Sequence, residues 1–454
     1  MNPILNTDSY KLSHFLQYPK DISFVNSYIE SRGGRWNRLI FYGLQAFLMQ
    51  YLSQKITADN ISEATEFAAL HGLPFNQAGW EYILNTHGGA LPLSIEAVKE
   101  GSIVGTENVL LQVQNTDAKV PWLVGWIETA LLRSIWYPVA VATKSYFCKQ
   151  IILHFLNETG DPADIEYALH DFGARGVSSF ESAGIGGSAH LLNFGGSDTI
   201  SGALFAMKYY GASMPAHSIP ASEHSTMTAW GKEHEALAFA NMSEKFGSSV
   251  FACVIDSYDA LNAIDLWAKN FDEIKRRGGR VVLRPDSGNP VTMAASCIER
   301  LFSHAGYSIN DKGYKLLPPF VRLIYGDGIT PESINDILSE LKMRRISASN
   351  ISFGMGGALL QHLNRDTLRF AMKTSAISSD GKIWQDVFKS PSTDATKRSK
   401  GGVLALIKQD GIYNTVRADE LKGQKNELEM VFKNGELLRQ SSFDEIKARI
   451  LEHS

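Results

Sequence analysis

Cysteine is scarce in this chain: Cys148, Cys253 and Cys297 are the three found in 454 residues. Their wide separation fits neither a disulfide framework nor a zinc site, which favours a reducing compartment. The first residues lack the basic start and apolar core of a signal peptide, and no uninterrupted apolar run is long enough to span a membrane. The formal net charge of −4 argues against a nucleic-acid-binding protein. We therefore expect a soluble cytoplasmic protein that binds neither nucleic acid nor a membrane.

The composition is that of an ordinary globular protein, with 44% hydrophobic and 20% charged residues. The length is sufficient for two domains with large cores, or for one barrel with an attached domain. Apolar spacing in the first part predicts helices over residues 41–52 and 120–136, and alternation predicts a strand over residues 109–114.

From Ile165 onwards, short apolar runs end in polar, glycine-rich corners and are followed by helical segments. The corners lie at His170–Gly173, Asp256–Asp259, Arg284–Gly288, Gly326–Gly328 and Gly354–Gly357. From the second corner on, successive corners are roughly 27 to 41 residues apart, the length of one strand–helix unit. This rhythm predicts parallel strands with helical crossovers, and its repetition favours an α/β barrel over a doubly wound open sheet. In a barrel the carboxyl ends of the strands share one face, so these corners would converge.

After Lys400 the pattern is typical of antiparallel strands. Residues 403–407 alternate, Asn434-Gly435 is a two-residue hairpin signal, and Ser442 to Glu445 form a capping box before a last helix. We therefore predict a mixed α/β domain built from both chain ends, residues 1–160 and 401–454, around a barrel domain of residues 161–400.

Charged side chains gather at the predicted strand ends. They are His170, Asp171, Arg175, Asp198, Glu223, His224, Asp256, Arg284, Asp286 and Asp327. Each aspartate by itself is explained as well by capping a helix or closing a turn. Together on one predicted face they favour a site for a phosphorylated sugar, because carboxylates accept hydroxyl protons and Mg²⁺ joins pyrophosphate to acidic residues directly or through water. The pair Glu223–His224 adds an imidazole that can act as acid, base or nucleophile, although a lone histidine is more often structural.

The corner Gly354–Gly357 predicts an anion-binding loop. Its glycines let the backbone approach closely, and a predicted helix over residues 358–363 would aim N–H groups at the anion, although a structural tight turn explains the corner equally well. Cations follow it at Arg365, Lys373, Lys389, Lys397, Arg398 and Lys400. A solvated basic loop is the usual explanation of such a run, and a polyphosphate pocket is the more specific one. The chain has no G-x-x-x-x-G-K-[ST] loop.

Short motifs follow one another in a single order through almost the whole chain. They are Asn6–Lys11, Phe41–Gln45, His170–Gly173, Arg175–Ser179, Gly196–Thr199, Ala221–Thr226, Thr228–Lys232, Arg284–Pro290, Gly326–Gly328 and Lys397–Lys400. In these motifs the sequence resembles the nicotinamide phosphoribosyltransferase family. The resemblance implies a homodimer of the type II phosphoribosyltransferase fold, an irregular α/β barrel joined to an α/β domain, with active sites at the subunit interface.

Matched position by position, the resemblance also implies roles for individual residues. Phe172 and, from the other subunit, Tyr10 would enclose the pyridine ring, and Asp198 would accept a hydrogen bond from the carboxamide. The implied substrate-binding residues are Asp8, Tyr10, Phe172, Arg175, Asp198, Arg284, Asp286, Gly326, Asp327, Gly357 and Arg365. The implied phosphate-binding residues are Arg32, Arg175, Gly356, Gly357, Arg365, Lys373, Lys389 and Lys397.

The catalytic residues implied by the resemblance are Glu223, His224, Asp256 and Asp286. ATP would phosphorylate His224 with help from Glu223, while Asp256 and Asp286 would hold Mg²⁺, through water. The expected reaction joins nicotinamide to phosphoribosyl pyrophosphate and yields nicotinamide mononucleotide and pyrophosphate, in the biosynthesis of NAD. Nicotinate phosphoribosyltransferase is the alternative, which Asp198 disfavours because it would repel the acid. A barrel hydrolase with paired carboxylates and a non-catalytic binding protein are the other classes considered.

Overall fold

The computed structural model describes residues 2–390, 392 and 398–452. The chain divides into two units. The first contains residues 1–143, 208–212 and 364–454, and the second contains residues 144–207 and 213–363. These ranges differ from the predicted domains, because residues 144–160 fall in the second unit, and residues 208–212 and 364–400 fall in the first.

The first unit is built on a seven-stranded sheet in the order β14-β13-β1-β5-β3-β17-β18. Its strands are β1 (Phe24–Ser31), β3 (Leu93–Ala97), β5 (Val109–Asn115), β13 (Phe370–Ser378), β14 (Gln385–Asp386), β17 (Glu429–Lys433) and β18 (Glu436–Leu437). Two smaller pairs accompany it, β2 (Arg38–Ile40) with β4 (Ile103–Gly105) and β15 (Leu404–Gln409) with β16 (Ile412–Arg417). Both ends of the chain contribute strands, which confirms the predicted mixed α/β domain.

Strand β13 explains why residues after Asn364 belong to the first unit. It pairs antiparallel with β1 from Phe24↔Ser378 to Ser31↔Phe370. On its other side β1 pairs with β5, so β1 lies inside the sheet and is buried along nearly its whole length. Long-range pairing of this kind leaves no local signal in the sequence.

The helices of the first unit are α1 (Leu44–Phe47), α2 (Ala58–Leu70), α3 (Gln77–His87), α4 (Leu123–Trp126) and α15 (Phe443–Leu451); α5 (Glu128–Thr159) begins there and continues into the second unit. The single helix predicted over residues 41–52 is wrong in its start. Gly43 has a φ of 105°, so α1 begins only at Leu44, and a π-helical turn continues it over Leu48–Leu52. The predicted hairpin at Asn434-Gly435 and the capping box at Ser442 and Glu445 are confirmed.

The second unit contains a five-stranded parallel sheet in the order β6-β12-β11-β8-β7. The strands are β6 (Leu169–Asp171), β7 (Val250–Val254), β8 (Arg280–Arg284), β11 (Val321–Tyr325) and β12 (Ile351–Met355); a short pair, β9 (Ser308–Ile309) with β10 (Lys315–Leu316), lies outside this sheet. From β7 onwards each strand of this sheet neighbours the next one in sequence, and the first strand, β6, pairs with the last, β12. This cyclic order is that of a barrel and excludes the doubly wound alternative, which confirms the predicted fold class.

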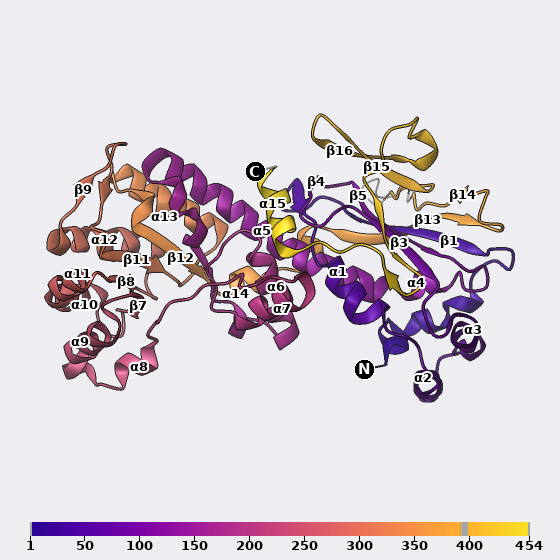
Figure 1. The fold of residues 1–454 in the computed structure, drawn as a ribbon, viewed down its shortest axis with the longest axis horizontal. Helices are drawn as coiled ribbons and strands as arrows, with labels where there is room; N and C mark the ends of the chain where they lie inside the picture. The colour runs from indigo at the N-terminus through magenta and orange to yellow at the C-terminus, as the bar shows by residue number, and fades with distance from the viewer. Residues whose placement is uncertain (1, 391, 393–397, 453–454) are drawn as a thin grey trace. The chain divides into compact units, whose positions relative to one another are not determined.

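The helices of the second unit are α6 (Phe180–His190), α7 (Ile200–Tyr210), α8 (His224–Thr228), α9 (Glu235–Phe246), α10 (Ala260–Trp267), α11 (Phe271–Arg277), α12 (Pro290–Ala305), α13 (Pro331–Met343) and α14 (Gly357–Leu360). Helices α10 to α13 flank the parallel strands (Figure 1). In α12 the buried residues Ala294, Cys297, Ile298 and Leu301 recur at helical spacing, so one face of that helix packs inward. Among the described residues, no helix combines the length and apolar character needed to cross a membrane.

A short segment, residues 217–222, closes the barrel where regular strands are missing. His217 donates its N–H to Gly195 O at 2.8 Å and accepts from Ser197 N at 3.0 Å, next to β6. A few residues later, Ala252 of β7 donates to Pro220 O at 2.8 Å and accepts from Ser222 N at 3.1 Å. We call residues 217–222 the seam, because they join the two edges of the five-stranded sheet.

Candidate active site

Phe172 marks the place where several strand ends of the second unit meet. Its ring follows β6 and lies against the backbone of β12, so that a Cβ added to Gly354 would be 2.0 Å from Phe172 Cε2. A Cβ on Gly326, after β11, would be 3.5 Å from the same atom, and the Arg284 guanidinium is 6.0 Å from the ring centre. The predicted substrate residues Phe172, Arg284 and Gly326 are therefore brought together, and glycine is needed at position 354 because no larger residue leaves room for the ring.

Three predicted aspartates lie near one buried phenol in the same unit, and we call Asp256, Asp286 and Asp327 the acidic cluster. Burial, followed by the negative charge of Asp327 and those of Asp256 and Asp286, raises the pKa of Tyr325 well above its usual value. The Tyr325 hydroxyl donates to Ser287 O at 2.8 Å. Asp286 Oδ1 also lies 3.0 Å from the position that a Gly326 Cβ would occupy. Tyr325 was not predicted as a site residue, because it ends an apolar run in the sequence and nothing nearby shows that aspartates surround its hydroxyl.

His224 is paired with Asp256. His224 Nε2 lies 3.0 Å from Asp256 Oδ1, and the two side chains are 45% and 6% exposed. His224 is the first residue of α8, while the Glu223 carboxylate accepts a hydrogen bond from Ser225 Oγ. The exposed Glu223 carboxylate therefore bonds within its own turn, and Asp256 is the carboxylate that contacts the imidazole. This arrangement orients the imidazole ring.

Asp198 is exposed and is fixed from two directions. Its N–H donates to Asp171 O at 3.0 Å, and its Oδ1 accepts from Ser218 Oγ of the seam at 2.6 Å. Asp171 is fully buried, and its Oδ1 accepts from Gly173 N at 2.7 Å. Burial, together with the nearby charge of Asp198, raises the pKa of the Asp171 carboxyl to about 6. Asp171 therefore supports both Asp198 and the turn that carries Phe172.

The glycine loop and Arg175 lie next to each other. A Cβ on Gly176 would be 2.9 Å from Gly357 Cα, so the loop that carries Arg175 touches the loop of Gly356 and Gly357. The predicted helix over residues 358–363 is wrong: α14 covers only Gly357–Leu360, and Gln361 and His362 both bond back to Gly357 O. The buried Lys144 ammonium donates to Ala358 O and His362 O, and these two hydrogen bonds fix the turn. A single turn has little dipole, so any anion here would be held by loop N–H groups and Arg175.

In the first unit, Arg32, Arg365, Lys373, Lys389 and Lys400 form what we call the basic cluster. Lys373, on β13, faces Tyr28 of β1. Burial lowers the pKa of Lys373, and the positive charges of Arg32, Lys389 and Arg365 lower it further, against an opposing effect of Glu128. Arg32 Nη2 is buried and has no hydrogen-bond partner among the described residues. These cations are therefore grouped closely enough to interact, as a polyanion site requires.

Asp8 and Tyr10 lie in the first unit, at the start of the chain. Thr129 Oγ1 donates to Asp8 Oδ2 at 2.6 Å, and the Tyr10 ring is 57% exposed beside His14. The role expected of Tyr10 in the partner subunit stays a prediction. Lys397 lies outside the described residues.

A metal ion would find two carboxylates rather than a complete cage. No group of three or more His, Cys, Asp or Glu residues in the described parts of the chain could hold a metal. Asp256 and Asp286, both near Tyr325, offer hard oxygen donors. This set fits Mg²⁺, which keeps several waters and binds through one or two carboxylates and the phosphates of a substrate.

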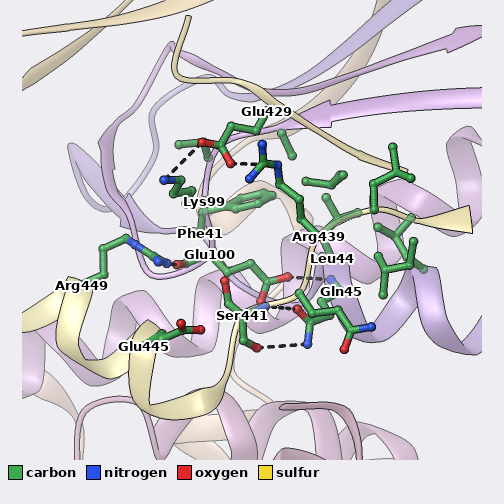
Figure 2. A pocket seen from close by; sticks show the side chains of 17 residues that line it. Phe41, Leu44, Gln45, Lys99, Glu100, Glu429, Arg439, Ser441, Glu445 and Arg449 are labelled. Carbon is green, nitrogen blue, oxygen red and sulfur yellow. Dashed lines mark hydrogen bonds and ion pairs between the residues drawn. The ribbon is translucent and has the colours of Figure 1, made fainter. Parts of the chain in front are cut away.

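A cavity of about 470 Å³ opens elsewhere in the first unit (Figure 2). None of its lining residues is a predicted site residue. Glu429 bonds to Lys99 at 3.2 Å and to Arg439 at 3.3 Å, and Gln45 exchanges hydrogen bonds with the Ser441 backbone. The polar groups of this cavity are engaged with one another, so its presence does not identify a ligand.

Comparisons with known proteins agree along the whole chain. Residues 167–436 match the model of the nicotinate phosphoribosyltransferase (NAPRTase) family, and residues 2–95 match that of the nicotinamide phosphoribosyltransferase N-terminal domain. The chain is 45% identical to the nicotinamide phosphoribosyltransferase of Xanthomonas campestris, over 98% of this chain and 97% of that protein. It is 36% identical to the enzyme of the same name from Mycoplasma pneumoniae, over 88% and 94% of the two chains.

Two solved structures share the fold at low sequence identity. The nicotinate-nucleotide pyrophosphorylase of Pyrococcus furiosus aligns with a TM-score of 0.64 and 16% identity, over 100% of this chain and 95% of that one. Human nicotinic acid phosphoribosyltransferase aligns with a TM-score of 0.60 and 18% identity, over 98% and 93%. At these identities the likeness establishes the architecture alone.

Proposed function

This chain belongs to the nicotinamide phosphoribosyltransferase family and has the type II phosphoribosyltransferase fold, and from that premise we propose that it converts nicotinamide and phosphoribosyl pyrophosphate to nicotinamide mononucleotide and pyrophosphate. It is a pentosyltransferase of NAD biosynthesis. The observation that carries the proposal is the assembly of Phe172, Arg284, Asp286 and Gly326 around one position at the strand ends.

Nicotinamide would stack on Phe172, with Asp198 accepting a hydrogen bond from the carboxamide NH₂. Ser218 already donates to Asp198 Oδ1, which leaves Oδ2 to accept from the amide. Nicotinate has no NH₂ to donate and would place a second negative charge beside this carboxylate. Discrimination of roughly 10⁴-fold is within the range of a missing hydrogen bond combined with a like-charge contact.

In the transfer, the C1–O bond to pyrophosphate breaks and a bond forms between C1 and the pyridine nitrogen, whose lone pair supplies the electrons. That nitrogen carries no proton, so no base is required, and catalysis rests on positioning and on stabilising charge. Asp286, Gly326 and Asp327 would hold the ribose hydroxyls. Arg175, Gly356 and Gly357, with Arg32, Arg365, Lys373, Lys389 and Lys397, would hold phosphate groups. Mg²⁺, when bound, would neutralise the departing pyrophosphate beside Asp256 and Asp286.

ATP would act as a co-substrate by phosphorylating His224. Asp256 contacts Nε2, which leaves Nδ1 to attack the terminal phosphorus while ADP departs. Hydrolysis of the phosphohistidine would then drive nucleotide formation forward. Glu223 would assist from the start of α8.

The protein would act in the cytoplasm as a homodimer, with Asp8 and Tyr10 completing the pocket of the partner subunit. In support of an interface, Phe180, Ile200 and Leu204 on α6 and α7 are 70%, 75% and 51% exposed. Sedimentation equilibrium should give twice the chain mass, and a fully active monomer would contradict shared sites.

The deciding experiment measures mononucleotide formation from nicotinamide or nicotinate, with and without ATP. We expect the amide to be strongly preferred, Asp198→Asn to reduce the preference, and His224→Ala to lose ATP stimulation while keeping some ATP-independent transfer. Equal or better use of nicotinate would favour nicotinate phosphoribosyltransferase instead. Sugar release without pyrophosphate would favour a hydrolase, and ligand binding without turnover would favour a binding protein.

A further inference from the structure

A buried carboxylate, Glu30, contacts two cations of the basic cluster. Glu30 is on β1 and is 2% exposed. Its Oε1 accepts from Arg32 Nε at 2.9 Å, and its Oε2 accepts from the Lys400 ammonium. Each carboxylate oxygen of Glu30 therefore holds a different cation, one directly after its own strand and one from the loop before β15.

Tyr28, also on β1, extends this contact. Its hydroxyl donates to Glu30 Oε1 at 3.3 Å and accepts from the Lys400 backbone N–H at 2.9 Å. Burial and the neighbouring Glu30 charge raise the pKa of Tyr28 to about 12, so the hydroxyl keeps its proton at neutral pH. The Lys400 residue is thus fixed at both its main chain and its side chain.

Glu30 accepts a hydrogen bond from Nε of Arg32, and Tyr28 is a second neighbour of the same side chain. Its Nη2 is buried and has no hydrogen-bond partner among the described residues. A buried guanidinium nitrogen without a partner is costly unless something binds it. The hydrogen bond at Nε fixes the plane of the guanidinium, so that Nη2 is held in one orientation without a partner of its own.

We propose that Glu30 is a positioning residue of the phosphate site: it holds Arg32 and Lys400 in fixed orientations so that both bind the pyrophosphate group of phosphoribosyl pyrophosphate. The inference rests on the proposed function for the identity of that substrate, and it adds Glu30 and Lys400 to the residues of the site.

Two roles for this carboxylate predict opposite effects of removing it. If Glu30 only neutralised the basic cluster, its loss would raise the positive potential and tighten the binding of a polyanion. If it positions the cations, its loss frees two long side chains, and their ordering then opposes binding. The direction of the change therefore distinguishes the two roles.

The experiment compares Glu30→Gln and Glu30→Ala with the unaltered full-length protein. Measured quantities are the KM for phosphoribosyl pyrophosphate, the KM for nicotinamide, kcat, and the Kd of inorganic pyrophosphate by calorimetry. Glu30→Gln keeps the shape and one acceptor oxygen for Arg32 or Lys400. We expect it to raise the KM for phosphoribosyl pyrophosphate and the pyrophosphate Kd about tenfold, with Glu30→Ala raising both further. The nicotinamide KM should not change.

Glu100→Gln is the matched control. Glu100 is another buried glutamate of the first unit, and its carboxylate accepts from Gly43 N and Gln45 N rather than from cations. Both carboxylate oxygens of Glu100 accept backbone N–H groups, so the NH₂ of Gln would oppose one of them, and we expect Glu100→Gln to change the Tm without changing the pyrophosphate Kd. This separates a change in stability from lost positioning.

An unchanged or lower pyrophosphate Kd in Glu30→Gln would overturn the inference. If the unaltered protein binds pyrophosphate but does not turn over nicotinamide, the proposed function fails while the Kd comparison still decides the role of Glu30. If the unaltered protein does not bind pyrophosphate, the basic cluster is not a phosphate site and the inference fails with it.

Discussion

The basic cluster of the first unit and the acidic cluster of the second are built in different ways. Arg32 and Lys373 stand on or directly beside paired strands of one sheet, and Glu30 inside that sheet fixes the orientation of Arg32. The aspartates of the acidic cluster follow strands β7, β8 and β11 and lie on the short loops after them. Under the proposed function the basic cluster would bind pyrophosphate, which needs cations fixed in advance, and the sheet gives Arg32 and Lys373 that support. The acidic cluster would bind ribose and Mg²⁺, whose oxygen ligands adjust more readily on loops at strand ends.

Each region has one buried ionisable group beside it or within it, Lys373 in the basic cluster and Asp171 near the acidic strand ends, and each of these groups reduces the stability of the protein when it is charged. The sign of the charge is reversed between them. Burial and neighbouring cations lower the pKa of Lys373, while burial and Asp198 raise that of Asp171, next to the acidic strand ends. Proteins commonly lose some folding stability at functional sites where like charges must lie close together.

Asp171→Asn should have the largest effect on stability, and it tests the buried carboxyl next to the acidic strand ends. The pKa of Asp171 is raised to about 6 from 3.8, so the folded protein binds the proton more tightly than the unfolded chain. Its stability contribution is present below about pH 3.8 and lost as pH rises through about 6. At pH 8 the variant should be more stable by up to about 3 kcal/mol, since Asn keeps the acceptor for Gly173 N without the buried charge.

Thermal unfolding of both proteins from pH 8 to pH 4 provides the measurement. The gain in Tm of Asp171→Asn should shrink toward zero near pH 4. A gain of the same size at every pH would mean that the pKa of this carboxyl is the same in the folded protein and in the unfolded chain.

Gly354→Ala should nearly abolish use of nicotinamide. Its Cβ would lie 2.0 Å from Phe172 Cε2, so the ring must leave its place. Displacement on this scale costs on the order of 100-fold in kcat/KM for nicotinamide. Steady-state kinetics should show this loss with an unchanged pyrophosphate Kd. Gly105→Ala is the control, because its Cβ would lie 3.6 Å from the nearest atom, and it should retain normal kinetics.

Lys373→Met tests the basic side. We expect the KM for phosphoribosyl pyrophosphate to rise about tenfold, because one charged hydrogen-bond donor is lost. The unliganded protein should become more stable, since the folded state disfavours the charged lysine. Lys433→Met, at an exposed position of β17, should change neither quantity. A lower Tm together with an unchanged KM would show that Lys373 is a structural residue.

Arg365→Gln should have the smallest effect. Arg365 is exposed and lies 3.5 Å from Asp366, so solvent and a neighbouring carboxylate both weaken its field. We expect the KM for phosphoribosyl pyrophosphate to rise about twofold to threefold at low salt and to approach the unaltered value near 0.5 M salt. A tenfold effect that persists at high salt would place Arg365 in direct contact with phosphate.

The barrel was predictable because each of its strands has a signal in the local sequence. The apolar runs around Val281, Val321 and Ile351 each end in a glycine or proline corner, and each became a parallel strand. The convergence of Phe172, Arg284 and Gly326 followed from the rule that parallel strands end on one face. The roles assigned to these residues came from the family resemblance and remain proposals.

Pairings between distant segments were not predictable. Nothing near Phe370 in the sequence shows that it pairs with Ser31, so residues 364–400 were assigned to the wrong neighbours. Glu30 is hidden for the same reason, because a glutamate within a strand is usually an exposed residue. The helix predicted over residues 41–52 begins too early, because apolar spacing gives no sign of the positive φ of Gly43.

The seam is a short length of backbone between two parts of the proposed site, the contact to Asp198 and the histidine proposed to be phosphorylated. Ser218, near its start, holds the carboxylate proposed to read the amide, and its end leads directly into Glu223 and His224. Because the seam is hydrogen-bonded to both sheet edges, it has little freedom to absorb a displacement. If His224 is phosphorylated as proposed, a phosphoryl group gained or lost there would displace Ser218, and the affinity for nicotinamide would follow the phosphorylation state of the histidine.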